Sequence, residues 1–162
     1  MNVATETAMQ LLHLEAWFLD NRRWNDWLAL YTNDAVYWVP AMDGDECWTK
    51  DPDKDVSLMY MDRAGLEARI FRIDGRDSYA TDPIPHTAHL VTNVLVHGAD
   101  EGLVQVSASW MVNSYLRTRG RLVRGGLYEY LLIATSDGLR IKTKKVFVHD
   151  DRIVGPIDIY NI

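Results

Sequence analysis

The most regular alternation of apolar and polar residues in the chain lies between residues 88 and 115. From residue 104 onward, every second position is apolar: Val104, Val106, Ala108, Trp110 and Val112. A two-residue period is typical of a strand with one buried face. A second alternation comes before residue 98, with Leu90, Thr92, Val94 and Val96 on one face and His89, Asn93 and His97 on the other. The intervening GADEG, residues 98–102, consists of turn-forming residues, so we predict an antiparallel hairpin.

Three more strands are expected from shorter patterns. Residues 127–134 and 139–148 flank the turn sequence Ser136-Asp137-Gly138, which predicts a second antiparallel hairpin. Residues 35–39 are rich in aromatic and β-branched side chains, and Pro40 ends that strand.

Helices are expected where apolar residues recur every three or four positions. This spacing predicts helices over residues 6–20, 23–32 and 56–73. Residues 41–55 form a polar, acidic loop, and residues 74–85 are irregular because glycine and proline interrupt them. Helices and strands are therefore segregated along the chain, which indicates an α+β fold with a curved sheet packed on helices. We expect residues 1–162 to form a single domain.

Composition narrows the possible partners and compartment. The chain has 162 residues and a net charge of −6, which argues against nucleic acid and anionic membranes as partners. The N-terminus lacks the pattern of a secretory signal, and no apolar run approaches membrane-spanning length. The single cysteine, Cys47, excludes an internal disulfide and fits a reducing cytosol.

The histidines are the first candidates for chemistry. Asp82, His86 and His89 have the residue types of a mononuclear iron site. Pro83 and Pro85 exclude a helix there, and an odd separation would send His86 and His89 to opposite faces of a strand. We therefore favour structural or hydrogen-bonding roles for both histidines.

His89, Asn93 and His97 could also line one wall of a pocket as acid–base groups. No carboxylate partner for either histidine is identifiable in the sequence, so we favour a polar surface that meets another subunit.

Other candidate sites are weaker. A divalent-cation site in the acidic loop 41–55 lacks the ligand spacing of a calcium loop. Cys47 is expected to be a spectator thiol, since no paired base accompanies it. One cysteine is too few for a Rieske cluster, which needs two. The arginines between residues 117 and 124 are expected to be solvated charges or to pair with a partner chain.

Several segments together resemble a known protein family. EAWFLDNRRWNDWLALYTNDAVYWVP at residues 15–40 resembles the opening of the small (β) subunits of aromatic-ring-hydroxylating dioxygenases. PAMD at 40–43, SLMY at 57–60 and GLEARIFRI at 65–73 resemble the benzoate and toluate branch. HLVTNVLV at 89–96, GLYEYLLI at 126–133 and the closing IDIYNI also match the family pattern.

This resemblance implies a cone-like fold of the nuclear-transport-factor-2 (NTF2) type, with a strongly curved, mainly antiparallel sheet. It also implies a large α subunit that carries a Rieske [2Fe–2S] cluster and a mononuclear iron, with electrons supplied from NADH by a reductase. Three α and three β subunits are expected to assemble, with the β subunits in contact as a trimer in the cytoplasm. No catalytic residue, cofactor or metal is expected in this chain.

Two functional hypotheses follow. The first is a non-catalytic structural subunit of a dioxygenase that converts a benzoate-like aromatic carboxylate to a cis-dihydrodiol. The second is a stand-alone dehydratase or isomerase of the same fold, in which His89 and His97 would act as acid–base groups inside the cone. Since one fold supports both roles, the arrangement of these histidines must discriminate between them.

Overall fold

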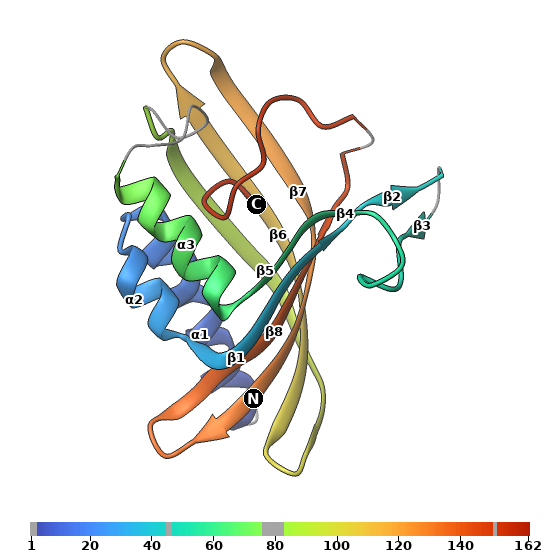
Figure 1. Ribbon diagram of the computed structural model, residues 1–162. Helices are drawn as coiled ribbons and strands as arrows, with labels where there is room; N and C mark the ends of the chain where they lie inside the picture. The colour runs from blue at the N-terminus through green and yellow to red at the C-terminus, as the bar shows by residue number, and fades with distance from the viewer. Residues whose placement is uncertain (1–2, 45–46, 76–82, 151) are drawn as a thin grey trace.

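The computed structural model describes residues 3–44, 47–75, 83–150 and 152–162. In these residues two helices are followed by four strands, a third helix and four more strands (Figure 1). The helices are α1 (Val3–Asp20), α2 (Trp24–Ala29) and α3 (Arg63–Asp74). The strands are β1 (Tyr31–Pro40), β2 (Met42–Asp43), β3 (Cys47–Trp48), β4 (Ser57–Asp62), β5 (His86–Asp100), β6 (Leu103–Leu116), β7 (Gly120–Thr135) and β8 (Gly138–Val148).

Six of the strands form one long sheet in the order β4-β1-β8-β7-β6-β5. All neighbouring strands in it are antiparallel except β1 and β8, which run parallel. The sheet twists and curves, and the three helices pack on one of its faces (Figure 1). The predicted α+β class, with a curved and mainly antiparallel sheet against N-terminal helices, is confirmed. No helix in the described part of the chain has both the length and the hydropathy needed to cross a membrane.

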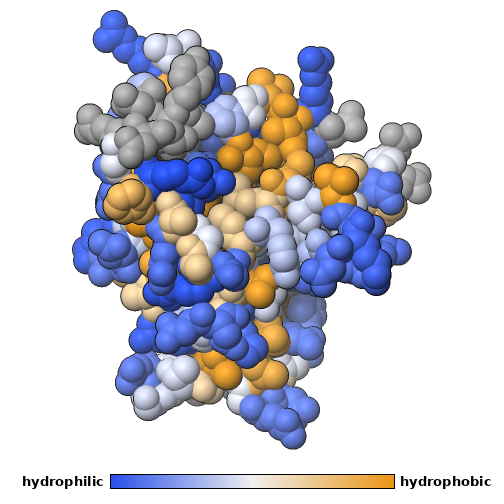
Figure 2. Space-filling view, in the orientation of Figure 1, coloured by the Kyte–Doolittle hydropathy of each residue, from blue (hydrophilic) through white to orange (hydrophobic). Residues whose placement is uncertain are grey.

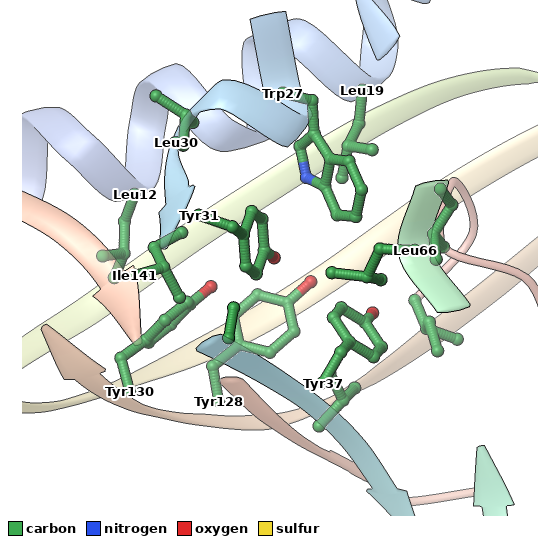
Figure 3. Packing of buried hydrophobic residues seen from close by; sticks show 14 of the residues in the cluster. Leu12, Leu19, Trp27, Leu30, Tyr31, Tyr37, Leu66, Tyr128, Tyr130 and Ile141 are labelled. Atoms are coloured by element: carbon green, nitrogen blue, oxygen red, sulfur yellow. The ribbon is translucent and has the colours of Figure 1, made fainter. Parts of the chain in front are cut away.

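The core lies between the helices and the inner face of the sheet, which is the face that they cover. The alternating apolar residues of β6 all lie on this face and are buried, as predicted. Figure 3 shows Leu12, Leu19, Trp27 and Leu66 from the helical side packed around Tyr31, Tyr37, Tyr128 and Tyr130 from the sheet. Rings and aliphatic side chains thus fill the inside of the cone.

Two of the predicted helices were too long. Residues 57–62, expected to be helical, form β4 and pair with β1. The segment has a two-residue period, since Met59 is buried between exposed Leu58 and Tyr60. α3 begins only after Asp62, whose carboxylate caps it by accepting a hydrogen bond from the Gly65 amide at 2.8 Å. Similarly, α2 ends at Ala29, because Tyr31 already pairs with Ile141 of β8.

The strands around the two hairpins are longer than predicted. β5 and β6 pair as far as Asp100 and Leu103, so only Glu101 and Gly102 form the turn. Both of these residues have positive φ. β7 begins at Gly120 and not at Leu127, so most of the arginine-rich segment belongs to the sheet.

A bulge in β5 corrects the predicted strand faces. The pairing of β5 with β6 shifts between Thr92 and Leu95, and Asn93 there has a φ of 52°. A shift of register exchanges the faces of all residues beyond it. His89 consequently faces the helices, whereas His97 lies on the opposite, outer face; the prediction that they share a face was wrong. Leu90, which we expected to be buried, is 53% exposed.

The close approach of β7 and β8 at Gly126 leads to a testable prediction. A Cβ at Gly126 would lie 1.9 Å from the Phe147 carbonyl oxygen and 3.2 Å from Trp110 Nε1. We expect Gly126→Ala to destabilise the fold by about 3 kcal/mol or more, since backbone must move to admit the methyl group. Urea unfolding of the purified chain measures this.

Gly98→Ala is the matched control, because a Cβ there meets no atom within 4 Å. It should change stability by no more than about 0.5 kcal/mol. Equal stability of the two variants would contradict the close packing described at Gly126.

Candidate functional site

A buried charged cluster joins α1 to the sheet. Glu15 of α1 accepts hydrogen bonds from Lys144 Nζ at 3.0 Å, from the Tyr130 hydroxyl at 2.8 Å and from the Tyr31 hydroxyl. Glu15 and Lys144 are 2% and 1% exposed. The Lys144 ammonium also lies 4.2 Å from the centre of the Tyr128 ring. One carboxylate thus connects α1 with β1, β7 and β8.

Burial controls the electrostatics of this cluster. Burial, together with the negative charge of Glu15, raises the pKa values of Tyr31, Tyr128 and Tyr130 well above the usual tyrosine range. Burial lowers the pKa of Lys144, and the Glu15 carboxylate opposes that shift. The tyrosines therefore remain neutral, and the hydroxyls of Tyr31 and Tyr130 donate to the Glu15 carboxylate beside Lys144.

A second polar pair lies where α1 meets β5. The Asp20 carboxylate accepts from the His89 backbone amide at 2.9 Å and from the Thr87 hydroxyl at 2.9 Å, and it lies 2.6 Å from His89 Nδ1. Burial alone would raise the pKa of Asp20, but the hydrogen bonds and charge of His89, with Thr87, hold it below its usual value.

This pair corrects a prediction. We expected no carboxylate partner for His89, yet Asp20 at the end of α1 is one. The two residues are 69 positions apart, and Asp20 by itself resembles a residue that ends a helix, so no local pattern connects them. The predicted separation of His86 and His89 onto opposite strand faces is consistent with their β6 partners, exposed Tyr115 and buried Val112.

The Asp20–His89 pair has the residue types of an acid–base dyad but lacks access. The His89 side chain is 2% exposed, and its Nε2 has no hydrogen-bond partner among the described residues. Neither Asp20 nor His89 lines the groove beside His97, the cleft at the C-terminal tail or the two hollows around Trp48. Because a general base must reach the proton that it abstracts, the geometry favours a role in holding α1 on β5.

The outer face of the sheet, opposite the helices, carries an exposed apolar patch on β5, β6 and β7. We call the following residues the outer patch: Leu90, Leu95, Met111, Tyr115, Val123 and Leu127. Exposed apolar areas of this kind on one sheet face are typical of interaction surfaces. The β2–β3 hairpin covers a different part of this face, where Trp48 packs edge-on against Phe147 of β8.

A groove of about 460 Å³ adjoins the outer patch. His97 lies in it and its Nε2 is 2.6 Å from the Ser107 hydroxyl, while Lys145 and Glu129 lie 4.0 Å apart nearby. His97 is thus a polar residue of the sheet surface, consistent with the expected role at a subunit contact.

The remaining candidates are dispersed. Cys47 is exposed and its thiol donates to the Asp43 carbonyl oxygen. Asp82 lies outside the described residues, and the described residues contain no group of three or more His, Cys, Asp or Glu that could hold a metal ion. Because a Rieske cluster needs two cysteines and the chain has one, its residues do not fit such a cluster. Arg124, expected among solvated charges, is instead buried.

Comparison with known proteins gives a consistent result. A family model described as "Ring hydroxylating beta subunit" matches residues 14–154. The chain is 36% identical to the benzoate 1,2-dioxygenase subunit beta of Acinetobacter baylyi, over 99% of this chain and 95% of that one. It is 38% identical to the 2-halobenzoate 1,2-dioxygenase small subunit of Burkholderia cepacia, over 91% and 90%.

Solved structures agree. The crystal structure of the beta subunit of benzoate 1,2-dioxygenase from Burkholderia mallei matches with a TM-score of 0.80 and 32% identity, covering 100% of this chain and 98% of that one. An NTF2-like protein from Novosphingobium aromaticivorans matches with a TM-score of 0.64 at 14% identity, over 91% of this chain and 82% of that one. The latter likeness concerns the fold, and the expected NTF2-like cone is confirmed.

The Glu15–Lys144 pair should be essential for stability. We expect Lys144→Met to lower the free energy of unfolding by about 3–5 kcal/mol, because it leaves the Glu15 carboxylate buried without its counter-charge. Lys145→Met is the control: its ammonium is partly exposed, so its loss should cost at most about 1 kcal/mol. Denaturant unfolding of both variants measures the difference. Similar losses of unfolding free energy in the two variants would contradict the stabilising role of the Glu15–Lys144 pair.

The Asp20–His89 pair should make a pH-dependent contribution to the stability of the fold. The folded pKa of Asp20 is below its unfolded value near 3.8, so its stabilisation is present above about pH 4 and is lost as the pH falls through the folded pKa. We expect Asp20→Asn to lower the free energy of unfolding by about 1–2 kcal/mol at pH 7. This gap between the variant and the unaltered chain should narrow below about pH 4.

Chemical unfolding at a series of pH values measures that gap. Asp26→Asn, which removes an exposed partner of Arg23, should show little gap at any pH. A gap for Asp20→Asn that stays the same from pH 5 to pH 3 would contradict the assignment.

Proposed function

The chain belongs to the ring-hydroxylating beta subunit family, and on this basis we propose that it is the non-catalytic small subunit of an aromatic-ring dioxygenase. Its role is to hold the catalytic large subunits in place. The observation that carries the proposal is the occupied interior: the Glu15–Lys144 cluster and the surrounding rings fill the space between helices and sheet, while the outer patch leaves apolar residues exposed on the opposite face of the sheet.

The partner is a large α subunit that contains a Rieske [2Fe–2S] cluster and a mononuclear iron, with electrons from NADH through a reductase. We propose an assembly of three α and three β subunits in which the β subunits also contact one another. Membership of a family of β subunits supports a hetero-oligomer. The outer patch and the neighbouring groove supply a surface with an apolar centre and polar edges, as subunit contacts have.

The substrate of the complex is a benzoate-like aromatic carboxylate, which receives both atoms of dioxygen and becomes a cis-dihydrodiol. Similar chains that belong to enzymes named for benzoate and 2-halobenzoate support this choice. We place no catalytic, cofactor-binding or metal-binding residue in this chain, and we treat residues 1–162 as one domain. The complex would work in the cytoplasm, where the exposed thiol of Cys47 stays reduced.

The alternative of a stand-alone dehydratase or isomerase is not favoured. It required His89 and His97 to share a pocket, and the bulge at Asn93 puts them on opposite faces of the sheet. His89 is buried against Asp20, and His97 lies in an open groove beside Ser107.

Assembly through the outer patch is testable by introducing a charge at its centre. Leu127→Asp should leave the fold intact, because Leu127 is exposed, but should reduce co-purification of a tagged large subunit by about tenfold or more. Co-expression followed by affinity capture and quantification of both chains, with circular dichroism of the free variant, measures this.

Phe71→Asp is the matched control. Phe71 is 75% exposed on α3, on the helical side of the molecule, so the same change in charge and size should leave co-purification unaffected. Undiminished capture of Leu127→Asp would remove the outer patch from the interface, and no capture of the unaltered chain would contradict the proposed role itself.

A further inference from the structure

A cleft of about 200 Å³ lies between the β6–β7 turn and the C-terminal tail, residues 152–162. We call it the tail cleft. Arg119 comes from the turn and Arg121 from the start of β7, Val154 and Tyr160 come from the tail, and Leu122 and Pro85 add apolar surface. Hydrophobic residues gather at the upper centre of Figure 2, where the tail lies in Figure 1.

The tail is a fixed wall. Ile159, Tyr160 and Ile162 are buried, and the Tyr160 ring packs against Trp24 at 6.5 Å between centroids. The Asn161 side chain accepts from the Asp158 amide at 2.9 Å and donates to the Pro156 carbonyl oxygen at 3.1 Å. The cleft is therefore preformed, and a ligand need not order the tail in order to bind.

The charges around the tail cleft do not balance. Arg69 pairs with buried Asp158 at 3.5 Å. Burial lowers the pKa of Arg124, and the nearby Asp150 carboxylate partly opposes this. Arg119 and Arg121, in contrast, have no ion pair with any carboxylate among the described residues. Two arginines without an ion-pair partner in the described part of the chain thus lie at the cleft.

Arg124 lies behind the tail and does not itself line the cleft. Its side chain is 3% exposed, and Nη2 donates to the carbonyl oxygen of Val154, a residue of the cleft wall. Its Nη1 is buried without an acceptor in the described part of the chain. Arg124 therefore contributes to the cleft by holding Val154 in its wall, while Arg119 and Arg121 are the arginines that line it.

We propose that the tail cleft binds a small organic carboxylate with a flat apolar body. Arginine guanidinium groups match carboxylates with paired hydrogen bonds, while Leu122, Pro85 and Val154 offer apolar surface to a ring. The volume is below the range of about 300–1,000 Å³ that accommodates drug-sized ligands, which favours a single-ring molecule. The cleft is argued from its own residues; only the choice of benzoate as the probe rests on the proposed function.

Isothermal titration of benzoate into the purified chain tests the proposal. We expect saturable binding with a Kd of about 1 mM or tighter, and at least about tenfold weaker binding of the neutral analogue benzamide. Arg119→Gln should weaken benzoate binding about tenfold, whereas Arg117→Gln, which removes a charge from the same turn outside the cleft, should not. Val154→Trp should abolish binding by filling the cleft without a change in charge.

Three results would overturn the proposal: no saturable binding up to about 10 mM benzoate, equal losses in Arg119→Gln and Arg117→Gln, or undiminished binding by Val154→Trp. An assay for capture of the large subunit distinguishes two explanations for the arginines, namely binding of a free small carboxylate or contact with a carboxylate of the partner chain. Lost capture by Arg119→Gln with no benzoate binding to the unaltered chain would overturn the ligand site and assign the arginine to the interface. Benzoate binding by a chain that captures no large subunit would support the cleft while the proposed function failed.

Discussion

The buried pair of Glu15 and Lys144 is the contact on which the arrangement of helix and sheet depends. The pair lies where α1 crosses the strands, and two tyrosine hydroxyls complete the hydrogen bonding of the carboxylate. Buried charges are stable only when such partners surround them, so the positions of α1, β1, β7 and β8 are interdependent. The same groups occupy the centre of the cone, which is where a stand-alone enzyme of this shape would need room for its substrate.

Because side chains fill the interior, the surfaces available for binding lie on the outside of the molecule. The bulge at Asn93 separates His89, which binds α1 through Asp20, from His97, which lies on the outer face of the sheet. The two histidines therefore lie in separate surroundings and do not form one site. The outer face retains exposed apolar residues beside a polar groove, and two arginines that pair with no carboxylate among the described residues line the tail cleft.

Much of the fold was predictable from alternation alone, because β6 buries every second residue against the helices and β8 does so from Lys144 onward. The errors arose where two periods compete. Residues 57–62 have apolar residues that fit either a helix or a strand, and only pairing with β1 decides between them. The bulge at Asn93 leaves no signal in composition, and contacts such as Asp20 with His89 join residues that only the folded chain brings together. The burial of Arg124 likewise depends on the tail, which lies thirty residues further along the chain.

The central claim is that this chain supports catalysis without taking part in it. The most direct test is the turnover per Rieske cluster of the assembled complex containing a chain with Asp20→Asn and His89→Gln together. The first substitution keeps the shape of the side chain, and the second replaces the imidazole by an uncharged polar group of similar length. The account predicts turnover per cluster equal to that of the unaltered complex, even if less complex forms. A fully assembled complex whose turnover per cluster falls by about a hundredfold, as removal of a general acid–base group would cause, would contradict it.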